Sequence, residues 1–152
     1  MSDFVTVRCL TNIDFFQKNV RLIAGENGLD RKVTFVTVQE APDFYTLLDG
    51  GEFVLSTWYA FRDHIDAGLI ALRNLSRYAS GVCIKTHRFL DEIPQSYVDF
   101  ANKEALPLFV VEKNVNFREI IRSVTIEINM SQMSTLIQVN DYYNFLFKAA
   151  LE

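Results

Sequence analysis

Apolar positions in this chain fall into short continuous runs separated by segments in which they recur every three or four residues. Runs rich in Val, Ile, Leu and Phe, bounded by turn residues, predict β-strands. Five such strands are expected, at residues 20–24, 33–38, 53–56, 82–84 and 108–111.

The segments between the strands carry helical spacing. After Asp63, a residue type that caps helices, apolar side chains recur up to Gly81 and predict an amphipathic helix of about four turns. Shorter helices are expected after Thr11 as an N-cap, from Asp43 to the glycine pair at 50–51, and from Pro94.

Strands that alternate with helices require crossover connections, which make neighbouring strands parallel. The sequence therefore predicts an α/β fold, with a mainly parallel open sheet of about five strands, helices on its faces and a long C-terminal helix. Residues 1–128 are expected to form the domain, and residues 129–152 a helix that forms a dimer contact or leads to a further domain.

Composition narrows the class of protein. The chain is 49% apolar and 22% charged, with a net charge of −4, so it lacks the clustered positive charge of DNA-binding domains. Cys9 and Cys83 stand in no disulfide or zinc spacing, and no cofactor motif is found. We find no secretory signal, and polar residues interrupt 129–147 too often for a membrane span. A cytoplasmic protein is expected.

All five predicted strands end in polar residues. In open parallel sheets, ligands bind beyond the carboxyl ends of the strands. This edge is expected to bind a small polar metabolite, although polar residues are also common in loops without such a role. The candidate ligand-binding residues are Glu40, Ser56, Thr57, Trp58, Lys85, Arg88 and Glu112.

Several motifs occur in an order that resembles the N-terminal sensory domain of PucR-type purine catabolism regulators. The resemblance covers about residues 20–128, and Trp58 stands where family members often carry glycine. The motifs are Gly25-Glu-Asn-Gly-Leu-Asp-Arg31, Val36-x-Val-x-Glu40, Gly51-Glu-x-x-Leu-x-Thr57, Lys85, Arg88-Phe-Leu-Asp-Glu-Ile-Pro94 and Leu106-Pro-Leu108.

The resemblance implies a ligand-sensing module of a bacterial transcription regulator, with a purine- or ureide-like ligand. It also implies that DNA is bound through a helix-turn-helix domain further along the full protein. A ligand-free dimerisation module is the alternative, and a small α/β enzyme is a third.

Residues 121–147 carry a pattern close to a heptad seam with a polar interruption, followed by an aromatic cluster. One domain has little left with which to bury that cluster, so a homodimer is expected. The candidate dimer contacts are Met133, Ile137, Tyr143 and Phe147.

Catalytic motifs are not evident. His64 and His87 lie in no metal-binding spacing, and the chain has neither a nucleophile elbow nor a phosphate-binding glycine loop. Arg31 and Arg88 are candidates either to bind a carboxylate or phosphate or to pair with nearby acidic residues. We therefore expect no enzyme activity.

Overall fold

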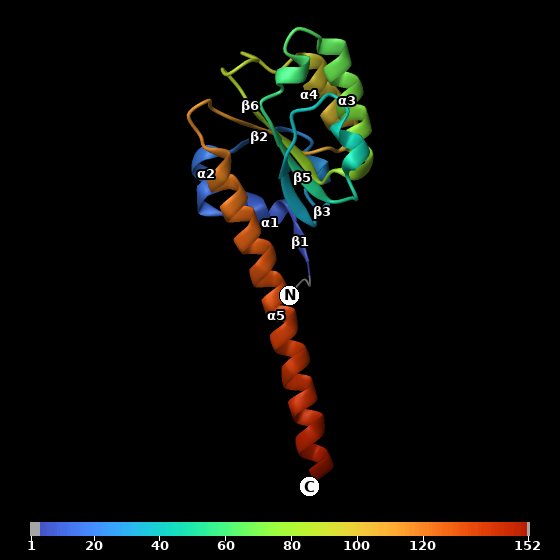
Figure 1. The fold of residues 1–152 in the computed structure, drawn as a ribbon, viewed down its shortest axis with the longest axis vertical. Helices are drawn as coiled ribbons and strands as arrows, with labels where there is room; N and C mark the ends of the chain where they lie inside the picture. The colour runs from blue at the N-terminus through green and yellow to red at the C-terminus, as the bar shows by residue number, and fades with distance from the viewer. Residues whose placement is uncertain (1–3, 152) are drawn as a thin grey trace.

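The computed structural model describes residues 4–151, in which a five-stranded sheet is covered by helices and a long helix projects from the domain (Figure 1). The strands stand in the order β2-β7-β6-β5-β4. Their bounds are β2 Arg21–Ala24, β4 Phe35–Val38, β5 Glu52–Ser56, β6 Gly81–Lys85 and β7 Leu108–Val111. Strands β4 to β7 pair in parallel, and β2 pairs antiparallel with β7. The predicted fold class is confirmed.

Helices lie on both faces of this sheet, and a small ribbon of β1 (Val5–Thr6) and β3 (Lys32–Val33) pairs antiparallel beside it. One face packs against α3 (Ile65–Tyr78) and α4 (Gln95–Glu104), and the other against α1 (Val7–Thr11), α2 (Asp14–Asn19) and the start of α5 (Phe117–Leu151). Single 3₁₀ turns are η1 (Glu26–Gly28), η2 (Phe44–Leu47) and η3 (Tyr59–Phe61).

Alternation along the central strands divides the core into two layers. In β5, Phe53 and Leu55 pack toward α5, whereas Val54 packs toward α3 and α4. On the α5 side, the rings of Phe16, Phe53 and Phe109 form a cluster with centroids 5.5–6.2 Å apart. Every residue of β5 is buried, as expected for a central strand of a sheet covered on both faces.

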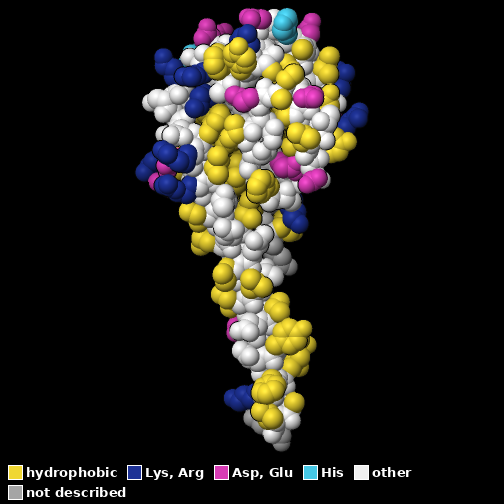
Figure 2. All heavy atoms as spheres, in the orientation of Figure 1, with side chains coloured by type: hydrophobic (Ala, Val, Ile, Leu, Met, Phe, Trp, Pro, Cys, Tyr) yellow, Lys and Arg dark blue, Asp and Glu magenta, His cyan; other side chains and the backbone are white. Residues whose placement is uncertain are grey.

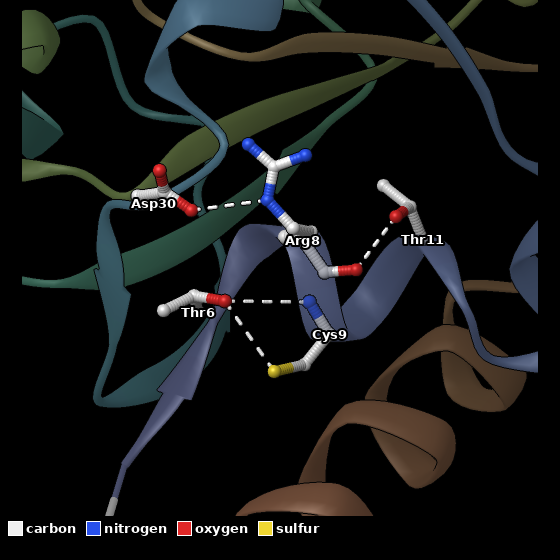
Figure 3. Close-up of polar contacts among 5 residues, drawn as sticks. All are labelled: Thr6, Arg8, Cys9, Thr11 and Asp30. Carbon is white, nitrogen blue, oxygen red and sulfur yellow. Dashed lines mark hydrogen bonds and ion pairs between the residues drawn. The ribbon is translucent and has the colours of Figure 1, made fainter. Parts of the chain in front are cut away.

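Two of the shorter predicted elements differ from expectation. The expected N-cap at Thr11 is wrong: Thr11 ends α1, its hydroxyl donates to the Arg8 carbonyl at 2.6 Å, and Thr6 caps this helix by accepting from the Cys9 amide (Figure 3). The helix expected from Asp43 is only the single turn η2.

The strand expected at 33–38 is divided between β3 and β4. At this break the Thr34 hydroxyl donates to the Gly50 carbonyl, 2.7 Å away, and the Thr34 amide donates to the Gly51 carbonyl. The first half of the predicted strand therefore pairs with β1, and the second half pairs with β5.

Among residues 4–151, Arg31 forms no ion pair with Asp30 or another acidic side chain, one of the alternatives that the sequence left open. Its guanidinium donates to four backbone carbonyls at the C-terminal ends of α3 and α4, at 2.7–3.1 Å. These carbonyls belong to Ser76, Ala79, Glu104 and Ala105. Burial lowers the Arg31 pKa, and the Glu104 carboxylate opposes that shift. Arg31 therefore joins two helix ends, where backbone carbonyls lack partners within the helix.

The long helix α5 is continuous across the boundary expected at residue 128. Its first turns pack on the sheet through Ile120 and Val124, which are fully buried, and Ile128 is partly buried. Beyond that point α5 leaves the domain (Figure 1). Within residues 4–151, no helix is long and apolar enough to cross a membrane.

Candidate functional site

The parallel strands β4 to β7 bring most of the predicted site residues to one edge of the sheet. Ser56 and Lys85 are the last residues of β5 and β6, and Glu112 directly follows β7. Strand β2 runs the other way, so its carboxyl end lies at the opposite edge. The expectation that all five strands end at one edge is therefore wrong for β2, an edge strand that, among the described residues, pairs only with β7 and that no crossover helix joins directly to β7.

Glu40 forms a hydrogen-bonded cluster with the end of β5. Its carboxylate accepts from the Ser56 hydroxyl at 2.6 Å and the Thr57 amide at 2.8 Å, and also from the Thr57 hydroxyl. The Ser56 hydroxyl in turn accepts from the Trp58 amide at 2.9 Å. These bonds orient two hydroxyls and one carboxylate at the edge, and they join the chain after β4 to the end of β5.

Lys85 lies between this cluster and the long helix. Its ammonium is 4.3 Å from the centre of the ring of Phe117, the first residue of α5. Burial lowers the Lys85 pKa, and repulsion from Arg88 adds to the shift, whereas Cys83 and Glu40 oppose it. Arg88 itself stacks 5.4 Å from the Phe89 ring. Lys85 therefore lies close enough to the Glu40 carboxylate to be attracted by it, and Arg88 lies close enough to Lys85 to repel it.

Glu112 lies in a separate part of the edge. Its carboxylate is 3.6 Å from the His87 ring nitrogen Nε2. Both residues line a hollow of about 320 Å³ beside the start of β2. The candidate residues thus divide into a Glu40 cluster with Lys85 and Arg88, and a hollow that contains Glu112.

Trp58 does not line the edge. Its side chain is fully buried, its ring nitrogen donates to the Tyr97 hydroxyl at 3.2 Å, and its ring packs 4.9 Å from that of Phe61. The backbone of Trp58 is left-handed, with a φ of 62°, a conformation that glycine adopts more readily than other residues. The ring expected at the strand end therefore belongs to the core beneath it.

Sequence reasoning missed three features of this edge. Tyr59 and Phe89 pack edge to face at 4.8 Å, and Arg62 stacks on Tyr59 at 3.7 Å. Arg21 reaches the hollow because β2 begins at this edge. A predicted parallel β2 would have placed Arg21 at the other edge, so no local signal pointed to it.

The described residues also limit the chemistry of the site. Within residues 4–151, no group of three His, Cys, Asp or Glu side chains is placed to hold a metal ion. In the same region, neither histidine is hydrogen-bonded to a hydroxyl or thiol, as a nucleophile and its base would be. The geometry provides hydrogen-bond acceptors, hydroxyls and positive charge, which are groups that can contact a polar ligand.

Comparison with known proteins now identifies the family. The model of the purine catabolism regulatory protein-like family matches residues 9–128. The chain belongs to this family. The match extends from α1 through the whole five-stranded sheet to Ile128, the last hydrophobic residue of α5 that packs against the core, so it covers the domain without most of the projecting helix.

A relative in Bacillus subtilis (strain 168), the purine catabolism regulatory protein, is 30% identical over 107 residues. The aligned region covers 70% of this chain and 20% of the relative, so the chain spans about a fifth of that protein's length. The resemblance read from the motifs is confirmed, and the chain is a regulator-family domain.

Proposed function

We propose that this chain is the non-catalytic sensory unit of a transcription regulator, in which a small polar metabolite bound at the carboxyl edge of the sheet alters the long helix. The main observation behind this proposal is the contact between Lys85 and Phe117. It links a candidate ligand-binding residue directly to the first residue of α5.

The chemistry of the edge supports a polar, hydrogen-bonding ligand such as a purine or ureide. Glu40, Ser56 and Thr57 offer oriented acceptors and hydroxyls, and Lys85 and Arg88 offer positive charge. A hydrogen-bond acceptor on the ligand that attracts the Lys85 ammonium would weaken the contact between that ammonium and the Phe117 ring. Such a ligand changes α5 only if it binds one arrangement of the helix better than the other.

The apolar seam of the long helix supports a homodimer, through which we propose that ligand binding is passed on. Ile126, Met130, Met133 and Ile137 follow heptad spacing, and all four side chains are more than half exposed. Figure 2 shows hydrophobic side chains along the projecting part of α5, where only Asp141 and Lys148 are charged between residues 129 and 151.

The polar interruption of the seam supports pairing with a second copy. Asn140 and Asn144 continue the spacing after Ile137, and Phe147 and Leu151 complete it. In a parallel dimer each asparagine faces its own counterpart, where the two amides can bond to each other and fix the register. Tyr143 and Phe147 are exposed beside these positions.

DNA binding is assigned to another part of the full protein. The chain has a net charge of −4, and the relative in Bacillus subtilis extends far beyond the matched region. The helix α5 would then connect sensing with that function.

The test is a thermal-shift screen of the chain against purines and ureides. A ligand at a hundred times its dissociation constant adds roughly 2.7 kcal/mol to the free energy of unfolding. We expect a saturable shift that Thr57→Val and Glu40→Gln reduce and that Thr125→Val, an exposed position on α5, leaves unchanged. No shift with any compound, or equal binding by all variants, contradicts the proposal.

A second candidate function, a dimerisation module without a ligand, is favoured by one observation. The Glu40 carboxylate already accepts three hydrogen bonds from its own chain, which is also what a purely structural tie would do. A stable dimer that binds none of the compounds would favour this alternative.

A further inference from the structure

The hollow of about 320 Å³ beside β2 has the size and the lining of a small-molecule site. Its apolar lining consists of Ile23, Ile93, Val98 and Val110. Polar side chains from three different segments surround this lining: Arg21 from β2, Glu112 after β7, and His87, Asp91 and Glu92 from the loop before α4.

Most of the charged groups around the hollow have no partner among the residues that the structure describes. Among residues 4–151, the side chains of Arg21, Asp91 and Glu92 form no hydrogen bond or ion pair with another residue, and Glu112 contacts only His87, at 3.6 Å. On the surface elsewhere, Arg8 pairs with Asp30 and Lys18 with Asp14. The hollow therefore concentrates charges that the fold leaves available.

The signs of these charges select a ligand class. Three carboxylates outnumber the single arginine, so the hollow favours a positively charged group. Arg21 is placed to bind a carboxylate, because a guanidinium matches the two oxygens of that group. The apolar lining accepts the carbon chain between the two charged ends.

We propose that this hollow binds a small zwitterion that carries an amine or guanidine group and a carboxylate, an amino-acid-like metabolite. This goes beyond the proposed function, because the hollow is separate from the Glu40 cluster, although both lie at the carboxyl edge of the sheet. The positive end lies toward Glu112, Asp91 and Glu92, and the carboxylate lies toward Arg21.

The test compares L-arginine with agmatine, which has the same guanidine and carbon chain but no carboxylate. Binding to the full chain is measured by calorimetry. We expect L-arginine to bind more tightly than agmatine to the wild type. Glu112→Gln should weaken both about tenfold or more, because each loses a charge-assisted hydrogen bond.

Arg21→Gln should weaken L-arginine alone and so abolish the preference over agmatine. Asp43→Asn is the matched control, because it removes one negative charge from an exposed position outside the hollow. Circular dichroism and the urea midpoint show whether each variant is folded as the wild type is.

The possible results separate this inference from the proposed function. Absence of binding by both compounds, or affinities that Glu112→Gln and Arg21→Gln do not change, overturns the zwitterion site. If a purine or ureide then binds and depends on Glu40 and Thr57, the proposed function stands without it. If no compound in either panel binds, both fail.

Discussion

At the scale of single residues, the motifs that the chain shares with its family mainly stabilise backbone turns and helix ends. Arg31 binds four carbonyls at the ends of α3 and α4. Glu52 is buried, and its carboxylate accepts from the amides of Asp49 and Gly50 at 2.8 and 2.6 Å. At Gly28, an added Cβ would lie 1.8 Å from the Ala105 carbonyl oxygen. Arg31, Glu52 and Gly28 thus stabilise the fold.

Arg31→Met tests this structural role. The substitution keeps an unbranched apolar side chain and removes the donors to four carbonyls, so we expect the free energy of unfolding to fall by about 2–4 kcal/mol. Urea denaturation followed by circular dichroism measures the loss.

Arg8→Met is the control, because the Arg8–Asp30 pair is exposed (Figure 3) and exposed pairs contribute little. Its urea midpoint should match that of the wild type. Equal losses in the two variants would contradict the role of Arg31.

At the scale of elements, α5 combines two environments in one continuous helix. Its first turns are part of the core, whereas its later turns carry large apolar side chains in water, such as Phe145 and Phe147, which are 70% and 69% exposed. A helix that is apolar on several sides is normally buried. Because the base of α5 is anchored by Ile120 and Val124, changes in the projecting half should leave the domain folded.

The double variant Met133→Glu/Ile137→Glu tests the dimer seam. Like charges facing each other across a parallel seam oppose pairing, so we expect the wild type to be a dimer and the double variant to be a monomer. Light scattering coupled to size-exclusion chromatography measures the mass.

Gln132→Glu is the matched control, since it adds charge on α5 outside the seam and should leave the dimer intact. A dimeric double variant would show that the seam does not mediate association. An unchanged urea transition of the domain would show that the variant remains folded.

At the scale of the whole molecule, the carboxyl edge of the sheet and the base of the projecting helix meet at one contact. Lys85 belongs to the last position of β6, and Phe117 begins α5. This contact crosses from the sheet to the helix that leaves the domain (Figure 1), so it connects the proposed sensing edge with the helix of the proposed dimer.

A double-mutant cycle with Lys85→Met and Phe117→Leu measures this connection. We expect a coupling free energy of about 0.5–1 kcal/mol from urea denaturation, the range of a partly exposed contact between a cation and a ring. A cycle of Lys85→Met with Phe100→Leu, on the opposite face of the sheet, should give none. Equal coupling in the two cycles would contradict a specific connection.

Sequence alone determined what depends on neighbouring residues. The positions of β5, β6 and β7, the helix after Asp63 and the apolar seam of α5 follow from periodicity, because the spacing of side chains on a strand or helix is set by local geometry. The same pattern predicted that Glu40, Ser56 and Thr57 lie at one edge, since parallel strands carry their ends to the same side.

Tertiary structure decided what depends on residues far apart in the chain. The antiparallel direction of β2 brings Arg21 beside Glu112, and packing against Phe61 and Tyr97 places Trp58 in the core. Arg31 finds its carbonyls only after α3 and α4 have packed. No local pattern encodes these contacts, because each is selected by the burial and pairing of distant segments when the sheet assembles.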